Sequence, residues 1–220
     1  MEAIFEKIEN LALWEGFEIL GLYWYENIVI FVYDKEQRIE PVTMPGFDCI
    51  GYPITEFANE IYQSNSFLFS MLEYGKCEVK LDFPYMNYFN ETASLKEHLK
   101  KASHMFMSMK RSKTWDVNKA GELLWHVESL NWISMTHKPS PLSLMELVNI
   151  QMDDTIRDHM INISELTSKR MEKDAILVDY VDMQLQAFRY RVQNMRIKRK
   201  DKYDLTQWVN AHFANETDRI

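Results

Sequence analysis

Apolar residues follow two different patterns along the first third of the chain, a helical spacing and then an uninterrupted run. Residues 3–13 place them three and four positions apart, which predicts an amphipathic helix that ends at Gly16. Two β-rich runs follow at 17–24 and 27–33, and the second is apolar without alternation. A strand of that kind is buried on both faces, so helices are expected on both sides of it.

Shorter elements are predicted in the next fifty residues, where prolines and glycines mark the turns. Their order is a strand at 42–44, a strand at 47–52, a helix N-capped by Thr55, a helix at 67–74 and a strand at 77–83. Strands and short helices therefore alternate through this part of the chain.

The hydrophobic period becomes helical from residue 94 onward. Ser94 and Glu97 have capping-box spacing, so a long helix is expected to begin at Ser94. Further helices are predicted to begin near Asp116 and Ser143 and then to cover 156–166, 177–195 and 205–213. The whole pattern predicts an α+β fold. A small mixed β-sheet with flanking helices occupies residues 1–90, and a mostly helical part with a basic C-terminal helix occupies residues 91–220.

Composition narrows the class of protein. Of 220 residues, 46% are hydrophobic, which is enough to bury a core. The net charge of −8 argues against a domain-wide basic face for nucleic acid. Cys49 and Cys77 are too few for a disulfide framework, and neither a signal peptide nor a membrane-spanning apolar run is seen. We therefore expect a cytoplasmic protein with free thiols that does not enter membranes.

Positive charge is concentrated near the C-terminus. Seven cations and one aspartate lie between Arg189 and Lys202, a local net charge of +6. The favoured interpretation is a solvated helix face or an intramolecular partner for the acidic remainder. The alternative is a nucleic-acid interaction module in which Tyr190 and Tyr203 stack on bases. Its phosphate-binding residues would be Arg196, Lys198, Arg199 and Lys200.

Three carboxylates near the predicted strands are candidates for a metal site. Asp34 and Glu36 follow the apolar strand one residue apart, so their side chains project to the same face of an extended chain. Such a pair can share a divalent cation that clamps a triphosphate, with Asp48 as a third ligand. The run from Asp34 to Arg38 is also typical of a solvent-exposed turn, and local sequence favours that interpretation. The histidines show no helical zinc spacing, and no Walker-type or dinucleotide-type phosphate loop is found.

One stretch of the chain combines a carboxylate-bearing strand with helices in a familiar order. It consists of Phe47-Asp48-Cys49-Ile50 through Ala58, followed by a helix that contains Met71-Leu72-Glu73. Later, Asn118-Lys119-Ala120 through Trp125-His126 forms a long apolar helix, and Pro139-Ser140-Pro141 forms a turn after it. In this pattern residues 16–171 resemble the bacterial and phage nucleotidyltransferase-like family of the DNA polymerase β type.

The resemblance implies a nucleotidyltransferase-like fold with a site for a nucleoside triphosphate and Mg²⁺. Family members carry a Gly-Ser pair that holds phosphates and two acidic residues that flank an apolar one. Gly21 matches the glycine, but Leu22 stands in place of the serine. Asp48 matches a third family carboxylate, and Asp34-Lys35-Glu36 has the spacing of the first two with Lys35 at the apolar position.

A second alignment is also open. It places Glu26 at one acidic position and Trp24 at the other, which leaves the metal pair incomplete. If exposed, the aromatic run Tyr23-Trp24-Tyr25 would favour a binding surface, although aromatic residues in strands belong more often to the core.

Two functions follow from the resemblance. The favoured one is a diverged nucleotidyltransferase-fold protein that is weak or inactive as an enzyme and binds a protein or a nucleotide. Loss of the metal pair removes most of the rate of such transfers, because charge neutralisation supplies most of their catalysis. The alternative is active Mg²⁺-dependent transfer of a nucleotidyl group to a protein, RNA or small-molecule acceptor, with the metal rebuilt on Asp34, Glu36 and Asp48.

Overall fold

The computed structural model describes residues 2–39 and 41–214. The fold is mixed α+β, with a small mixed sheet and flanking helices, as predicted. The chain forms two compact units, residues 1–89 together with 199–220, and residues 90–198. The second unit begins at residue 90, next to the boundary of 90/91 expected from the sequence, whereas the last helix belongs to the first unit.

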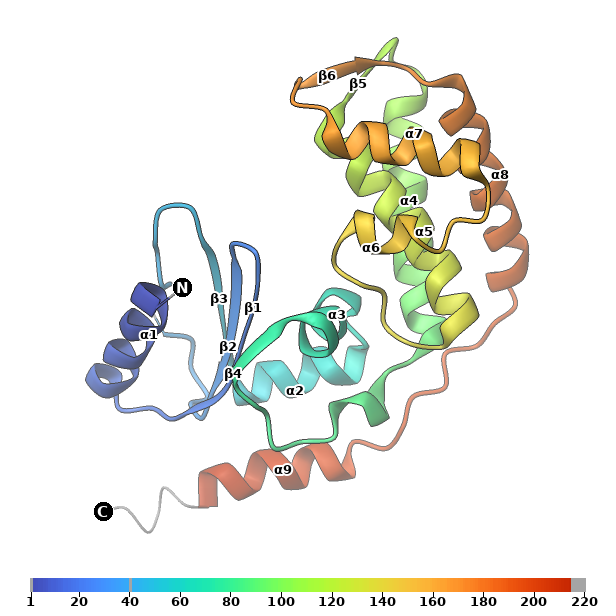
Figure 1. Ribbon diagram of the computed structural model, residues 1–220. Coiled ribbons are helices and arrows are strands. Elements are labelled where there is room, and N and C mark those ends of the chain that lie inside the picture. The colour runs from blue at the N-terminus through green and yellow to red at the C-terminus, as the bar shows by residue number, and fades with distance from the viewer. Residues whose placement is uncertain (1, 40, 215–220) are drawn as a thin grey trace. The chain divides into compact units, whose positions relative to one another are not determined.

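A four-stranded mixed sheet lies at the centre of the first unit, in the order β3-β2-β1-β4 (Figure 1). β1 (Ile19–Tyr25) and β2 (Ile28–Tyr33) form an antiparallel hairpin. β3 (Asp48–Pro53) pairs in parallel with β2, and β4 (Lys76–Val79) pairs antiparallel with β1. The strands predicted at 17–24 and 27–33 are thereby confirmed.

Helices cover both faces of this sheet (Figure 1). α1 (Glu2–Glu15) packs on one face in a core cluster that includes Val29 and Phe31. The alternate residues Ile30 and Val32 are fully buried as well, on the face where α2 (Ile54–Gln63) and α3 (Ser66–Tyr74) pack. The absence of polar alternation in β2 therefore has the predicted cause.

Two expectations near β3 are corrected. Residues 42–44 do not form a strand, because Pro45-Gly46 turns the chain back and leaves only an isolated bridge between Met44 and Phe47. α2 begins directly after Pro53, and Thr55 does not cap it. The fixed backbone of the proline suits the start of a helix without a side-chain cap.

β4 is also shorter than predicted, since it ends at Val79 and not at residue 83. The backbone N–H of Leu81 donates to the hydroxyl of Tyr23 at 3.0 Å. That side-chain acceptor takes the place of a strand partner, so the chain can leave the sheet without a buried unpaired N–H.

The second unit consists of helices and one small ribbon. The three longest helices pack against one another, the two shorter ones pack against α5, and the ribbon is antiparallel. The elements are α4 (Glu91–Lys110), β5 (Thr114–Asp116), α5 (Val117–Thr136), α6 (Leu144–Val148), α7 (Asp154–Glu165), β6 (Arg170–Glu172) and α8 (Ala175–Val192). None of the helices that the structure describes is long and apolar enough to cross a membrane.

Helix caps were predicted with mixed success. Asp116 and Ser143 cap α5 and α6, as expected. α4 begins four residues earlier than expected, because Asn90 is its cap and accepts a hydrogen bond from the N–H of Ala93 at 3.0 Å. Ser94 is buried inside the helix, and its backbone N–H donates to the carbonyl of Asn90 at 3.0 Å.

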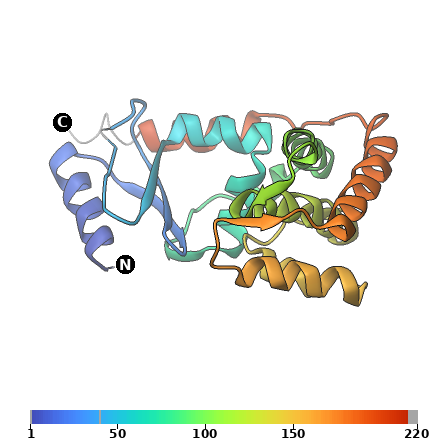
Figure 2. The ribbon, with the colours of Figure 1, turned by 90° about the horizontal axis from the view of Figure 1, so that it is seen from above.

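The basic stretch is not the predicted C-terminal helix. α8 ends at Val192, and residues 193–202 are non-helical. α9 (Tyr203–Ala214) follows and lies alongside α2 in the first unit (Figures 1 and 2). The Trp208 ring lies 4.9 Å from the ring of Phe83 and 6.0 Å from that of Phe57. This aromatic contact explains why α9 belongs to the first unit.

Candidate functional site

Asp34 is held by the backbone at the end of β2. Its side chain is buried, and its Oδ1 accepts the backbone N–H of Glu18 at 2.6 Å. The backbone N–H of Asp34 donates in return to the Glu18 carbonyl at 3.2 Å. These two bonds fasten the open end of the β1–β2 hairpin, so the carboxylate has a structural role. Glu36 lies exposed in the turn that follows.

Asp48 lies at the opposite end of the strand pair. Because β3 is parallel to β2, Asp48 stands opposite Ile28, whereas Pro53 stands opposite Tyr33. Asp34 and Asp48 are therefore separated by about 20 Å along the strands, at 3.3 Å per residue. The predicted convergence of Asp34, Glu36 and Asp48 on one metal is corrected. Within residues 2–39 and 41–214, no group of three or more histidine, cysteine or acidic side chains is placed to hold a metal ion.

The hairpin turn lies at the same end of the sheet as Asp48. The backbone N–H of Asp48 donates to the carbonyl of Asn27 at 2.9 Å, and Glu26 precedes Asn27 in the turn. Both carboxylates are exposed. The structure thus brings Asp48 close to the turn named by the second alignment and away from Asp34.

Gly21 lies in β1 and not in a phosphate-binding loop, so that expectation is corrected. A Cβ at this position would lie 2.7 Å from Cγ of Leu81, which packs directly on the strand. The glycine is needed for this close approach. In the aromatic run that follows, Tyr23 is buried and Trp24 packs against α1, so these two rings belong to the core.

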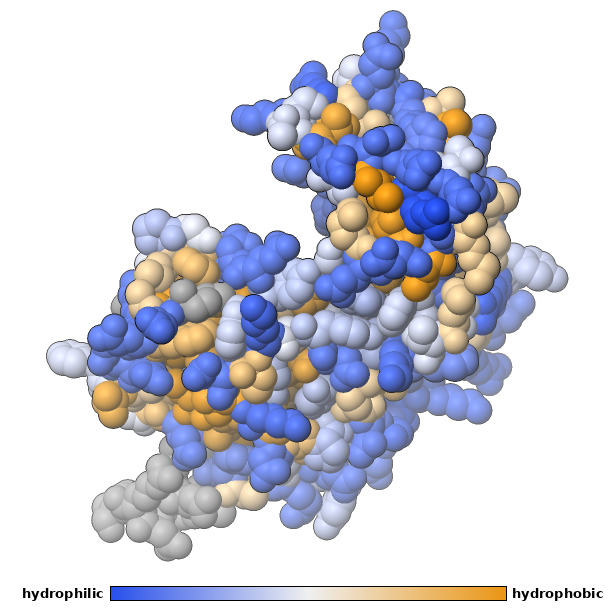
Figure 3. Space-filling view, in the orientation of Figure 1, coloured by the Kyte–Doolittle hydropathy of each residue, from blue (hydrophilic) through white to orange (hydrophobic). Residues whose placement is uncertain are grey.

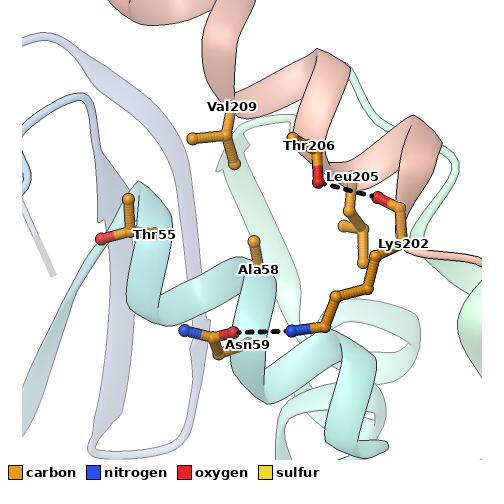
Figure 4. Close-up of a pocket in the computed structure, with 7 residues that line it drawn as sticks. All are labelled: Thr55, Ala58, Asn59, Lys202, Leu205, Thr206 and Val209. Carbon is orange, nitrogen blue, oxygen red and sulfur yellow. Dashed lines mark hydrogen bonds between the residues drawn. The ribbon is translucent and has the colours of Figure 1, made fainter.

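A small hollow of about 190 Å³ lies between α2 and α9 in the first unit (Figure 4). Its residues are Thr55, Ala58, Asn59, Lys202, Leu205, Thr206 and Val209. The ammonium of Lys202 lies 3.3 Å from Oδ1 of Asn59 and 4.3 Å from the ring centre of Tyr62. Lys202, the one cation among these described residues, is therefore already engaged by α2, and its charge serves the packing of the two helices.

A groove of about 440 Å³ runs between α4 and α8 in the second unit. Three of its seven residues are cations, and none of these described residues is acidic. They are Lys96, Leu99, Lys100, Ser103, Arg189, Val192 and Gln193. The groove therefore has an excess of positive charge in a protein whose net charge is negative.

Hydrogen bonds hold two of the three cations in place. Lys96 Nζ donates to the carbonyl of Met195 at 2.6 Å, and an Nη of Arg189 donates to the Ser103 hydroxyl at 3.2 Å. Each bond uses one N–H of a group that has three or five, so further donors remain for an anion. Lys100 is exposed between these two contacts.

Two carboxylates on these helices have cationic partners of their own. Glu97 pairs with Lys101 at 2.6 Å, and Asp182 pairs with Lys110 at 2.8 Å. The hydrogen bond from Lys110 also lowers the pKa of Asp182. Neither carboxylate lines the groove, but Arg189 also lowers the pKa of Asp182, so part of the charge of Arg189 is balanced by this carboxylate.

The basic segment is divided between the two units. Arg196, Lys198, Arg199 and Lys200 are all exposed. Arg196 and Lys198 follow α8 within the second unit, where the Lys198 carbonyl accepts a hydrogen bond from Asn90 at 2.7 Å. Arg199 lies in the first unit with its guanidinium 5.4 Å from the ring centre of Tyr62. Only the first two of the four thus extend the charge of the groove.

Two histidines are buried against each other in the second unit. His98 on α4 and His126 on α5 are 1% and 4% exposed, and their Nδ1 atoms lie 2.9 Å apart. One ring must donate and the other accept, so the accepting ring must be neutral. Burial and then the neighbouring His126 lower the pKa of His98 to about 3, and burial and then Lys101 lower that of His126 to about 4.

A second buried polar cluster surrounds Glu128 on α5. The hydroxyl of Tyr180 donates to Glu128 Oε1 at 2.5 Å and accepts from Gln151 Nε2 at 2.8 Å. Asn131 Nδ2 donates to the other carboxylate oxygen at 3.2 Å. Burial raises the pKa of Glu128. Both oxygens have partners in this cluster, which therefore links α5 to α8 as part of the core.

Apolar side chains also reach the surface of the second unit near α6 and α7 (Figure 3). Met145 and Met152 are 42% and 87% exposed. The apolar side chains visible in this part of Figure 3 are interspersed with hydrophilic ones, as is common on protein surfaces.

Sequence reasoning identified Arg189 within a charged run but missed Lys96 and Lys100. Their spacing of four residues puts both lysines on one side of α4. That spacing could have indicated a cationic side of α4, but it did not indicate that α8 would pack alongside α4 and complete the groove. The nucleotidyltransferase resemblance stays a prediction carried by Phe47–Ala58 and by the order of the elements. Among protein-family models, curated proteins and solved structures, no match to this chain is found.

Proposed function

We propose that the chain is a binding protein that takes a phosphate-bearing ligand in the groove between α4 and α8. The observation that carries this proposal is the set of three cations, Lys96, Lys100 and Arg189, in a groove with no acidic lining residue. A local excess of positive charge attracts anions, and phosphate groups accept several hydrogen bonds at once.

The positions of the cations support binding of more than a simple counter-ion. Lys96 and Arg189 are fastened to opposite parts of the groove, so their charges are preorganised before a ligand arrives. The hydroxyl of Ser103 and the amide of Gln193 add neutral donors to the lining. A ligand with several negatively charged oxygens would use all of these groups.

The proposal is a binding function and not a transfer reaction, because the carboxylates expected to hold Mg²⁺ do not share one end of the sheet. It retains the idea of a diverged nucleotidyltransferase-like framework that binds a nucleotide. The ligand is bound by helices of the second unit, however, and not by Gly21 or Asp48.

Calorimetric titration with inorganic tripolyphosphate tests the proposal. The wild-type chain should bind it, and the variant with Lys96→Gln and Lys100→Gln should bind at least tenfold more weakly, about 1.4 kcal/mol. The matched control is Lys119→Gln with Lys138→Gln, which removes the same charge from exposed positions elsewhere in the second unit. Equal losses in both variants, or no binding by the wild type, would refute the proposed site.

A further inference from the structure

We infer that the ligand of the α4–α8 groove is a single-stranded nucleic acid, with successive phosphates along the cations and an unpaired base stacked on Tyr190. This inference rests on the proposed function and specifies the class of its ligand. It depends on three features of the second unit: the linear arrangement of the cations, the continuation of positive charge past the end of α8, and one exposed aromatic ring.

The cations form a row and not a cluster. Lys96 and Lys100 are separated by four residues of α4, which is about 6 Å along the helix axis. The contact between Ser103 and Arg189 lies three residues further, about 5 Å beyond. One phosphate group cannot touch the whole row, whereas a chain of linked phosphates can follow it.

The row continues beyond the groove at the end marked by Lys96. Its ammonium binds the carbonyl of Met195, and the next residue along the chain is Arg196. Arg196 and Lys198 are both exposed, and the hydrogen bond from Asn90 holds the backbone at Lys198. A ligand longer than a nucleotide would therefore meet further positive charge in the same unit.

Tyr190 supplies a contact that phosphates alone would not need. It follows Arg189 on α8 and is 80% exposed. A single exposed aromatic side chain is common on protein surfaces, but Tyr190 is the chain neighbour of a groove cation, and an aromatic ring together with cations is the combination used to bind single strands. Bases in a duplex are stacked on each other, so only an unpaired base can present its face to this ring.

The experiment measures binding of a labelled single strand of about 12 nucleotides by fluorescence anisotropy at several salt concentrations. The slope of log affinity against log salt should be about −2 if only the three groove cations neutralise phosphates and about −3.5 if Arg196 and Lys198 do so as well, at about −0.7 per phosphate. Lys100→Gln should make the slope about 0.7 less steep. Tyr190→Ala should weaken binding about tenfold at an unchanged slope, and Tyr190→Trp should restore it.

Tyr203→Ala is the matched control, because Tyr203 is also exposed but belongs to the first unit. It should change the affinity less than twofold. A duplex of the same sequence and inorganic polyphosphate serve as competing ligands. Both should compete more weakly than the unlabelled single strand.

The outcomes separate the two proposals. If the chain binds tripolyphosphate but prefers duplex, or if Tyr190→Ala has no effect, the single-strand inference is overturned while the phosphate-binding groove stands. If neither tripolyphosphate nor the oligonucleotide binds, the proposed function itself is overturned. An equal effect of Tyr190→Ala and Tyr203→Ala would assign the loss to something other than the groove.

Discussion

The buried histidine pair should make the second unit lose stability as the pH falls below neutrality. In the unfolded chain each ring has a pKa near 6.5, whereas burial lowers the folded values to about 3 for His98 and about 4 for His126. A depressed folded pKa means that the unfolded state binds more protons. The stability is therefore fully present above the unfolded pKa and is lost as the pH falls toward the folded values.

The expected loss follows from this difference in proton binding. At about pH 5.5 an unfolded histidine is about nine-tenths protonated, while the folded pair remains neutral. The free energy of unfolding should then fall by about 1.4 kcal/mol per ring, or about 3 kcal/mol for the pair, between about pH 7.5 and pH 5.5. Glu128 opposes this trend. Its pKa is raised in the folded state, so the folded state binds more protons than the unfolded state as the pH falls, and this contributes stability. The contribution of the histidine pair to the pH dependence must therefore be measured by comparison with a variant that lacks both rings.

The variant is His98→Asn with His126→Asn, since asparagine places a polar atom close to the position of Nδ1 but does not titrate. Hydrogen exchange of α4 and α5 in urea reports the stability of this unit at each pH. The double variant should lose about 3 kcal/mol less than the wild type on acidification. His104→Asn, an exposed histidine on the same helix, should behave as the wild type does. Equal pH dependence in the wild type and the double variant would refute the reasoning.

Three further substitutions test individual contacts. Gly21→Ala should destabilise the first unit by about 1–3 kcal/mol, because its Cβ would lie 2.7 Å from Cγ of Leu81; an unchanged urea midpoint would contradict this. Tyr180→Phe removes the donor to Glu128, so hydrogen exchange should show a loss of about 1–3 kcal/mol in α5 and α8, and no loss would mean the cluster is not coupled. Trp208→Ala should cost up to about 3 kcal/mol and expose α9 to proteolysis, and unchanged cleavage of α9 would show that the ring does not hold the helix.

The central strands of the first unit were predictable because their signal is local. The uninterrupted apolar run in β2 predicted burial on both faces, and α1 with α2 and α3 provides it. The wrong prediction of the α4 N-cap, at Ser94 and not at Asn90, also concerns a local choice. Both Asn90 and Ser94 are good capping residues, and the choice between them depends on which backbone N–H groups the surrounding structure leaves unpaired.

The expected metal site failed for a non-local reason. The spacing of Asp34 and Glu36 describes one strand end, but it does not say which end of β3 comes next to it. Parallel pairing places the beginning of β3 beside the beginning of β2, so Asp48 is remote from Asp34. The contact of His98 with His126 and the groove of Lys100 with Arg189 likewise depend on how helices far apart in sequence pack together.

The hydrogen bond between Asn90 and the Lys198 carbonyl joins the first and last residues of the second unit. The second unit is therefore inserted within the first, with its two ends held together as one attachment point. During synthesis the ribosome completes all of residues 90–198 before it makes α9, the last described helix of the first unit. Until Trp208 has been synthesised, it cannot cover the apolar surfaces of Phe57 and Phe83. The earlier unit in sequence is thus the later one to be completed.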